Sequence, residues 1–278
     1  LAPATHTNTY LVGNKRFVVI DPATPYPEEQ QHLKRRITER MAQGDSPEAI
    51  LLTHHHLDHV GGAAFLQAEF GVPVFAHPLT QQRLQSMDYP LRIDALIQPD
   101  HVWDLSTPGQ TFRLEALFTP GHAPGHVCFI EPHHKLGFVG DMVAGVGSIV
   151  IQHPEGSQDP DGHMQRYLDS LQRLKALALR RAFPAHGPML TQPNQVFEDY
   201  IAHRLHREAQ ILKHLAQQPL SLRQLRHKVY PDLAPALEQF AEDSLRAHLV
   251  KLTDEERIAH TPHEHGEEVI SLLTYSPP

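Results

Sequence analysis

The twelve residues LLTHHHLDHVGG, at positions 51–62, place four histidines and one aspartate within six consecutive positions, directly after an apolar run. Two of the histidines lie four apart, as in the helical HExxH motif of zinc proteases, but position 56 is His where that motif has the Glu that acts as general base. A buried strand is predicted at residues 49–53, just before the cluster, and the pair Gly61–Gly62 follows it. The cluster is therefore predicted to lie on a loop that follows a strand.

This loop has the spacing of a site for two metal ions. Alternate residues of an extended turn point to the same side, which places His54 and His56 together, while Asp58 and His59 can reach a second ion close by. Two ions need more ligands than one loop supplies. Each further candidate stands beside Gly or Pro at the end of a predicted strand, where a tight turn fixes the side chain. These further candidates are His122, Asp141 and His186.

These residues resemble the signature of the metallo-β-lactamase superfamily. The segment THHHLDH at 53–59 matches its H-x-H-x-D-H motif at every defining position, and the later His, Asp and His follow in the family's order over roughly residues 8 to 190. The resemblance implies an α/β fold, a four-layered αββα sandwich with the site at one edge. It also implies one metal held by His54, His56 and His122, the other held by Asp58, His59 and His186, and Asp141 bridging the two.

The ligand types indicate hydrolysis. Neutral imidazoles and a few carboxylates leave two dications with a net positive charge, so a bridging water loses a proton near neutral pH and becomes the nucleophile. Asp58 is expected to orient this hydroxide and to pass a proton to the leaving group. We expect two divalent metal ions, with zinc the best match to the ligands and manganese or iron also compatible.

The rest of the chain divides into two parts. Up to about residue 185 short strands alternate with amphipathic helices, which is typical of an α/β domain. From residue 192 three helices follow, and then two short strands around a polar turn. This order predicts a catalytic domain over residues 1–191 and a winged-helix-like domain over residues 192–278.

Two details support the C-terminal assignment. Ser221 and Gln224 have the spacing of a capping box, which predicts the start of a helix. In the long helix before it, four apolar residues are predicted to share one face: Ile201, Leu205, Leu212 and Leu215.

Within the superfamily the chain is most similar to the β-lactamase-like hydrolase branch that includes a mitochondrial endoribonuclease. This similarity is carried by the winged-helix-like tail and by the stretches NTYLV, PAHGP and YIAHRLHREAQIL, at residues 8–12, 184–188 and 200–212. One departure is His6, where that branch often has Gly.

The ligands do not rank the substrates. Esters, thioesters, lactones and RNA phosphodiesters all suit the same nucleophile, so the partner is expected to be a small-molecule acyl substrate or single-stranded RNA. A glyoxalase II-like thioesterase shares the THHHxDH and PGHxxGH patterns. Antibiotic-cleaving lactamases often have cysteine where this chain has Asp141, and a flavin-linked oxygen reductase would need a flavodoxin domain that this sequence lacks. In a different class, the chain would be a winged-helix nucleic-acid-binding or scaffold protein with a non-catalytic metal domain.

Charge argues against a general affinity for nucleic acid. The chain has 24 Lys and Arg against 32 Asp and Glu, a net charge of −8 at pH 7, which gives no overall attraction to phosphate backbones or anionic lipids. Residues 200–278 hold nine basic and eleven acidic residues. A basic patch would have to come from six residues in the first two helices of the tail: Arg204, Arg207, Lys213, Arg223, Arg226 and Lys228.

Cysteine usage and hydropathy bear on location. The one cysteine, Cys128, excludes an intramolecular disulfide and fits a reducing compartment. No stretch approaches the roughly 18 uninterrupted apolar residues of a membrane span, and the first residues lack a basic region followed by an apolar one. We expect a cytoplasmic protein without membrane contact, and the amphipathic tail is compatible with a homodimer.

Other polar features are expected outside the coordination sphere. His55 is predicted to point away from the ligands, His126 to be a hydrogen-bonded structural residue, and His163 to start a helix. The stretch Met142–Gly162 lacks periodicity and is predicted to be a functional loop. A solvated turn is predicted for His260, His263 and His265.

Overall fold

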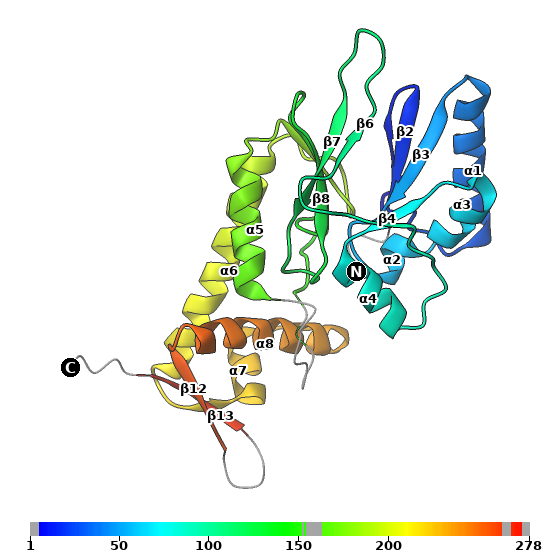
Figure 1. Cartoon of the computed structure of the whole chain (residues 1–278). Helices are drawn as coiled ribbons and strands as arrows, with labels where there is room; N and C mark the ends of the chain where they lie inside the picture. The colour runs from blue at the N-terminus through cyan, green and yellow to red at the C-terminus, as the bar shows by residue number, and fades with distance from the viewer. Residues whose placement is uncertain (1–5, 152, 154–162, 263–267, 274–278) are drawn as a thin grey trace.

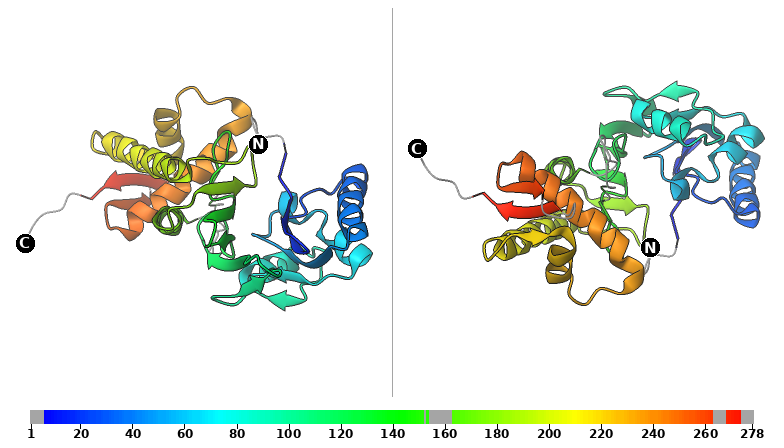
Figure 2. Two further views of the ribbon diagram at one scale, coloured as in Figure 1. Left: turned by 90° about the horizontal axis from the view of Figure 1, so that it is seen from above. Right: turned by 90° about the horizontal axis from the view of Figure 1, so that it is seen from below.

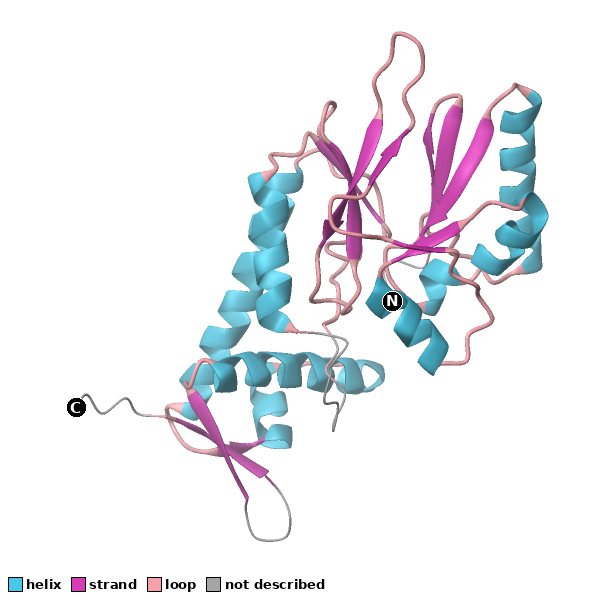
Figure 3. Cartoon of the chain, viewed as in Figure 1, coloured by secondary structure: helices cyan, strands magenta, loops and turns pink. Residues whose placement is uncertain are grey.

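The computed structural model describes residues 6–151, 153, 163–262 and 268–273 (Figure 1). Two five-stranded sheets face each other with helices on their outer faces, and a smaller three-stranded sheet lies in the C-terminal part (Figure 3). The predicted four-layered αββα sandwich with a C-terminal winged-helix-like module is therefore confirmed.

The first sheet comes from the N-terminal part of the chain. Its strands, in spatial order, are β1 (Tyr10–Gly13), β2 (Arg16–Ile20), β3 (Ser46–Leu51), β4 (Val74–Ala76) and β5 (Ala95–Leu96). β1 and β2 form an antiparallel hairpin, and the other neighbours are parallel. The strand predicted at 49–53 ends two residues earlier, at Leu51. The reason is that the Thr53 N–H donates to the Asp21 carboxylate at 2.8 Å instead of continuing the sheet.

The second sheet comes from the middle of the chain. Its strands, in spatial order, are β10 (Arg181–Pro184), β9 (Leu136–Gly140), β8 (Val127–Glu131), β7 (Arg113–Phe118) and β6 (Val102–Asp104). β10 and β9 are parallel, and the other pairs are antiparallel, including the β8–β9 hairpin.

Alternation along the strands divides the apolar residues between two layers. Val18 and Ile20 of β2 face the second sheet, where they join a core that includes Phe129. Phe17 and Val19 of the same strand point the other way, into a core shared with the outer helices. Successive side chains of a strand point to opposite faces, so a strand that is apolar throughout belongs to a sheet covered on both sides.

Helices cover the outer face of each sheet. On the first sheet lie α1 (Pro27–Ala42) and α3 (Ala63–Phe70), and on the second lie α5 (Met164–Ala176) and α6 (Pro193–Leu215) (Figure 1). The shorter helices of this part are α2 (Leu57–Val60) and α4 (Pro78–Ser86). No helix in the described ranges is long and apolar enough to cross a membrane.

The C-terminal part has the three helices and the small sheet of a winged helix. Its elements after α6 are β11 (Leu220–Ser221), α7 (Leu222–Val229), the 3₁₀ turn η1 (Pro235–Leu237), α8 (Glu238–Asp254), β12 (Ile258–Pro262) and β13 (Glu268–Leu272). The capping box of Ser221 and Gln224 is present at the start of α7. This part lies on the side of the second sheet, away from the first sheet (Figure 2). The boundary at residues 191 and 192 stays a prediction, since α6 packs against both parts.

One helix face was predicted wrongly. Leu205 of α6 is 49% exposed, whereas Arg204 and Glu208 of the same helix are 4% and 3% exposed. Glu208 is held by Lys251 of α8 at 2.9 Å and lies 3.4 Å from the imidazole of His248. The face of α6 that packs against α8 is therefore occupied by the buried ion pair of Glu208 and Lys251, and Leu205 lies on the exposed side of the helix.

The exposed and buried faces of α6 predict opposite mutational effects. Phe197 is fully buried between α6 and the second sheet, so Phe197→Ala is expected to lower the free energy of unfolding by about 3–5 kcal/mol. Leu205→Ala, on the exposed face of the same helix, is expected to change it by less than about 0.5 kcal/mol. Urea titrations of both variants test this, and a large loss for Leu205→Ala would contradict the assigned face.

His248 is expected to make stability depend on pH. Burial lowers the pKa of His248 to about 4, despite the neighbouring Glu208 carboxylate, whereas an unfolded histidine titrates near about 6.5. Between these values the unfolded chain binds the proton first, so stability falls as pH drops from about 6.5 to about 4, by up to about 3 kcal/mol. Urea titrations across this range are expected to show a flatter profile for His248→Gln. The exposed-site control His227→Gln is expected to retain the wild-type slope.

Candidate metal centre

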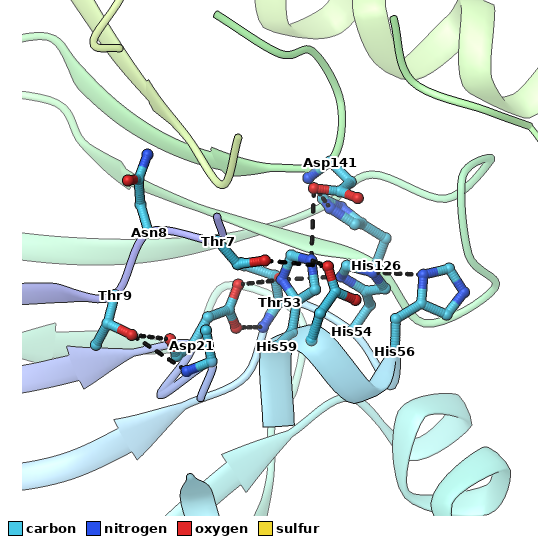
Figure 4. A network of polar contacts seen from close by, with 12 residues as sticks. Thr7, Asn8, Thr9, Asp21, Thr53, His54, His56, His59, His126 and Asp141 are labelled. Carbon is cyan, nitrogen blue, oxygen red and sulfur yellow. Dashed lines mark hydrogen bonds and ion pairs between the residues drawn. The ribbon is translucent and has the colours of Figure 1, made fainter. Parts of the chain in front are cut away.

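The seven predicted ligands lie together at one edge of the sandwich, between the two sheets. Figure 4 shows four of them, His54, His56, His59 and Asp141. His54 and His56 lie in the loop between β3 and α2, whereas Asp58 and His59 lie in the short helix α2 and not in the predicted loop. The other three ligands follow β7, β9 and β10. Each therefore lies just beyond the carboxyl end of a strand, where loops are positioned by rigid sheets.

Three imidazole nitrogens form a first group. His56 Nδ1 lies 2.9 Å from His54 Nε2 and 3.1 Å from His122 Nε2. A neutral imidazole has one nitrogen with a free lone pair, which is the donor that zinc and similar cations accept. Three such nitrogens facing a common point match a three-ligand metal site that keeps one position open.

Asp58, His59 and His186 form a second group. Asp58 Oδ2 lies 3.8 Å from His59 Nε2 and 3.5 Å from His186 Nε2. The side chain of Asp58 is 56% exposed, while that of His59 is buried. This group therefore opens to solvent on the side of the Asp58 carboxylate.

Asp141 stands between the two groups. Its Oδ2 lies 3.4 Å from His122 Nε2, in the first group. Its Oδ1 lies 3.5 Å from His59 Nε2 and 3.4 Å from His186 Nε2, in the second. One carboxylate oxygen thus faces each group, as a bridging ligand requires.

Two buried atoms at the centre make no hydrogen bond within the described part of the chain. They are His59 Nε2 and Asp141 Oδ1. A buried polar atom without a partner destabilises a fold by about 1–3 kcal/mol, and both atoms are good donors to a divalent cation. The residues present therefore fit a metal ion at this position.

Asp21 is a functional residue that the sequence interpretation missed. It follows β2, is 2% exposed, and has φ +46°, in the left-handed region. Its Oδ2 lies 2.8 Å from His59 Nδ1 and accepts a hydrogen bond from the Thr53 hydroxyl at 2.6 Å. A carboxylate behind an imidazole ligand fixes the ring and its tautomer and strengthens the opposite nitrogen as a donor. An aspartate directly after an apolar strand, like Asp141, was the signal that could have identified it.

The second ring nitrogens of His54, His122 and His186 are also held. The contacts are His54 Nδ1 with the Thr53 hydroxyl at 2.9 Å, His122 Nδ1 with the Val150 carbonyl at 3.0 Å, and His186 Nδ1 with the His6 carbonyl at 3.1 Å. These contacts orient the coordinating nitrogens toward the centre. The Val150 contact gives the predicted functional loop a structural role, within the portion of Met142–Gly162 that the structure describes.

His126 supports the bridging residue from behind. Its Nε2 accepts the backbone N–H of Asp141 at 3.2 Å, and its Nδ1 lies 2.9 Å from the Thr119 hydroxyl. Gly140, at φ +49°, lets this ring approach, because a Cβ there would lie 2.6 Å from His126 Nε2. The prediction of a hydrogen-bonded structural histidine is confirmed.

A second close approach fixes the turn that carries His122. Gly121 has φ +137°, and a Cβ at this position would lie 2.3 Å from the backbone of Tyr167 in α5. Only glycine fits both the backbone conformation and the space, so α5 packs directly against this turn.

The first group of ligands differs in charge from the pair of His59 and Asp141. Burial lowers the pKa of His54, His56 and His122. Burial also disfavours the charged form of His59, but the carboxylates of Asp141 and Asp21 outweigh it and raise the pKa of His59. In turn, His59 and His186 outweigh burial and keep the pKa of Asp141 low. The first group thus offers neutral nitrogens, and Asp141 is an anion.

The other singled-out histidines lie outside the ligand groups. His55 is 3% exposed and is therefore a buried residue. His163 starts α5 as expected, and its Nδ1 accepts the N–H of Arg166 at 3.5 Å. His260 lies in β12 and not in a turn, because its ring is 3.2 Å from Glu268 of the paired strand β13. His263 and His265 lie outside the described residues.

Known families match both parts of the chain. Residues 2–186 match the metallo-β-lactamase superfamily, and residues 221–266 match the β-lactamase-associated winged helix domain. The chain belongs to the metallo-β-lactamase superfamily. Members of this superfamily bind divalent metals, and the His and Asp cluster supports a metal-dependent hydrolase.

Named relatives share most of this chain. The lactamase-like protein nscB of Arthroderma benhamiae is 30% identical over 272 residues, which cover 92% of this chain and 56% of that protein. The β-lactamase-like protein 2 homolog of Drosophila melanogaster is 31% identical over 262 residues, covering 91% of this chain and 84% of that protein. The chain thus spans little more than half of the Arthroderma protein.

Solved metallo-β-lactamase structures have the same fold. A β-lactamase domain protein from Burkholderia ambifaria, 18% identical, superposes with a TM-score of 0.81 over 96% of this chain and 87% of its own. A metallo-β-lactamase family protein from Thermus thermophilus, 21% identical, gives 0.73 over 96% and 94%. The protein TTHA1623, 31% identical and solved in a di-iron-bound form, gives 0.52 over 70% of this chain and 94% of its own.

Removing the outer carboxylate is expected to weaken metal binding. Asp21→Asn replaces an oxygen that holds the His59 ring or the Thr53 hydroxyl, so the affinity for Zn²⁺ is expected to fall about 10- to 100-fold. Competition with a fluorescent chelator measures this. The matched control is Asp88→Asn, at an exposed aspartate that also has positive φ. Equal affinities for both variants would show that Asp21 does not orient His59.

Proposed function

We propose that this protein is a hydrolase that uses two divalent metal ions to cleave an ester or thioester bond of a small acyl substrate. The observation that carries the proposal is the position of Asp141, whose two oxygens face two separate groups of donor atoms. A carboxylate in this position can join two ions and hold them at a fixed separation.

The proposed ligands are the seven residues of the two groups and the bridge. His54, His56 and His122 would hold one ion, Asp58, His59 and His186 the other, and Asp141 both. Zinc matches the three-imidazole group best, and iron is supported by the di-iron form of the relative TTHA1623. When bound, such ions supply an acidified water and polarise the carbonyl of the substrate.

Asp58 is placed to move protons at the entrance of the site. Its carboxylate is the exposed member of the second group and accepts a hydrogen bond from the Thr7 hydroxyl at 3.1 Å. A carboxylate oriented in this way can take a proton from an attacking water and return it to the departing alcohol or thiol. His54, His59 and Asp141 are buried and line the opposite, closed side.

The contacts that the basic residues of the C-terminal part make within the fold favour an acyl substrate over RNA. Arg226 is paired with Glu238 at 2.7 Å and lies 3.9 Å from Glu242. Arg207 stacks over the Tyr230 ring and donates to the Val229 carbonyl. Arg204 is buried. Three of the six cations are therefore engaged within the fold, which leaves a weaker phosphate-binding surface than the sequence allowed.

Location and assembly belong to the same proposal. A buried, lone Cys128 supports a reducing, cytoplasmic location, and the amphipathic C-terminal part supports a homodimer. Size-exclusion chromatography with light scattering measures the assembly.

Substrate class is tested with two labelled substrates side by side. Zn²⁺-loaded protein is expected to hydrolyse an S-acyl-N-acetylcysteamine thioester and to leave single-stranded RNA intact. Asp58→Ala is expected to lower kcat by about 10²- to 10⁴-fold, because its proton transfer is lost. Asp88→Ala is the exposed-site control and is expected to keep wild-type turnover. Cleavage of RNA alone, abolished in Asp58→Ala, would assign the nuclease function instead.

A further inference from the structure

A cavity lies where the C-terminal part meets the catalytic part. It has a volume of about 270 Å³ and is bounded by residues 148–150, by α6, by α8 and by the segment before α8. Most of its wall is apolar. The apolar wall is formed by Ile149, Val150, Leu233, Leu237, Phe240 and Ala241. Pockets for complete drug-sized ligands begin near about 300 Å³, so this one suits a part of a molecule.

A buried cation lines this apolar cavity. Arg204 of α6 is 4% exposed and donates one hydrogen bond from Nη2 to the Ile149 carbonyl. Its Nε is buried without a hydrogen-bond partner in the described ranges. The guanidinium carbon lies 5.5 Å from the centre of the Tyr167 ring, and no described carboxylate forms an ion pair with Arg204. Buried charges are normally paired, because an unpaired one loses its hydration without compensation. The described partners of Arg204 are thus a carbonyl and an aromatic ring, and none of them is an anion.

The same stretch of chain connects this cavity to the candidate metal centre. Val150 lines the cavity, and its carbonyl contacts His122 Nδ1 at 3.0 Å. Ile149, the preceding residue, is the partner of Arg204. In Figure 1 the start of α8 lies below the edge of the sandwich that carries α2. Val150 thus lies between the cavity and the outer nitrogen of His122.

We propose that this cavity binds the acyl part of the substrate, and that the acyl part is an apolar chain ending in a carboxylate that pairs with Arg204. The apolar wall buries the chain, and the guanidinium supplies two parallel donors to a carboxylate. This proposal deepens the proposed acyl hydrolase function and rests on it for the reaction. The C-terminal part is then a specificity element of the catalytic site.

Two thioesters of equal chain length test the charge requirement. The adipoyl and hexanoyl thioesters of N-acetylcysteamine differ only in the terminal carboxylate, and both are offered to Zn²⁺-loaded protein. Wild type is expected to prefer adipoyl by about 10- to 100-fold in kcat/KM, the range for a hydrogen bond to a charged group. Arg204→Gln is expected to bring the ratio near one by raising KM for the adipoyl substrate, with kcat retained. Arg204→Lys keeps the charge and is expected to restore part of the preference.

Further variants separate the cavity from general damage. Ala241→Leu fills the apolar wall and leaves Arg204 in place, so it is expected to slow both six-carbon substrates relative to the acetyl thioester. Lys213→Gln changes an exposed cation of the same helix and is expected to leave the adipoyl preference unchanged. Thermal unfolding and metal content, measured for every variant, identify those that fail to fold.

Binding is measured separately from turnover. Ligand-observed NMR is expected to detect hexanoate on wild type, with weaker binding of hexanamide and of hexanoate to Arg204→Gln. If no thioester is hydrolysed but hexanoate binding depends on Arg204, the hydrolase proposal fails and the cavity assignment stands. If both thioesters react equally and Arg204→Gln binds hexanoate as wild type does, the cavity proposal is overturned and the hydrolase function stands.

Discussion

The two sheets meet at one imidazole held between two carboxylates. His59 has Asp21 on one nitrogen at 2.8 Å and Asp141 near the other at 3.5 Å. Asp21 follows β2 of the first sheet, and Asp141 follows β9 of the second. All three side chains are buried, so their charges interact through a medium that screens them poorly. The relative position of the sheets and the geometry of the candidate metal centre are therefore set by the same contact.

The long helix α6 joins the two parts of the chain through three kinds of contact. Phe197 packs in the core of the second sheet, while Ile211 belongs to the core of the C-terminal part. Between them, the Tyr200 hydroxyl accepts the N–H of Ala144 at 3.0 Å, in the segment that follows Asp141. Glu208 then pairs with Lys251 of α8. A helix that enters two cores and also holds a site loop cannot shift without affecting all three.

The sequence predicted the architecture and the ligands because both leave local patterns. The motif at 53–59 lies within one short segment, and the later ligands stand beside Gly or Pro at strand ends, so each could be recognised without knowing its neighbours. The layers were implied by the resemblance to the metallo-β-lactamase superfamily. The fold class and the superfamily were confirmed, while the individual ligand assignments remain a proposal.

Features that depend on distant residues were missed. Asp21 acts through His59, 38 positions away, and nothing in its own segment reveals that partner. Leu205 was placed inside because a helical period treats Arg204 and Glu208 as surface residues, whereas Lys251 and the Ile149 carbonyl bind them in the interior. Two of the six residues of the expected basic patch, Arg204 and Arg226, are buried for the same kind of reason. In each case the position of the side chain depends on a contact with a residue that is distant in the sequence, and local sequence patterns do not reveal such contacts.

The adjacent carbonyls of Ile149 and Val150 bind opposite partners, the guanidinium of α6 and the imidazole of His122. Residues 149–150 therefore connect the catalytic part and the C-terminal part, so the two parts cannot be exchanged independently. A chimera that exchanged the C-terminal part for that of a relative would break the Arg204 contact and release the loop that orients His122. Protein engineers who wish to transplant the C-terminal part should therefore move residues 148–150 together with it. In evolutionary terms, the two parts are expected to have diversified as a single unit.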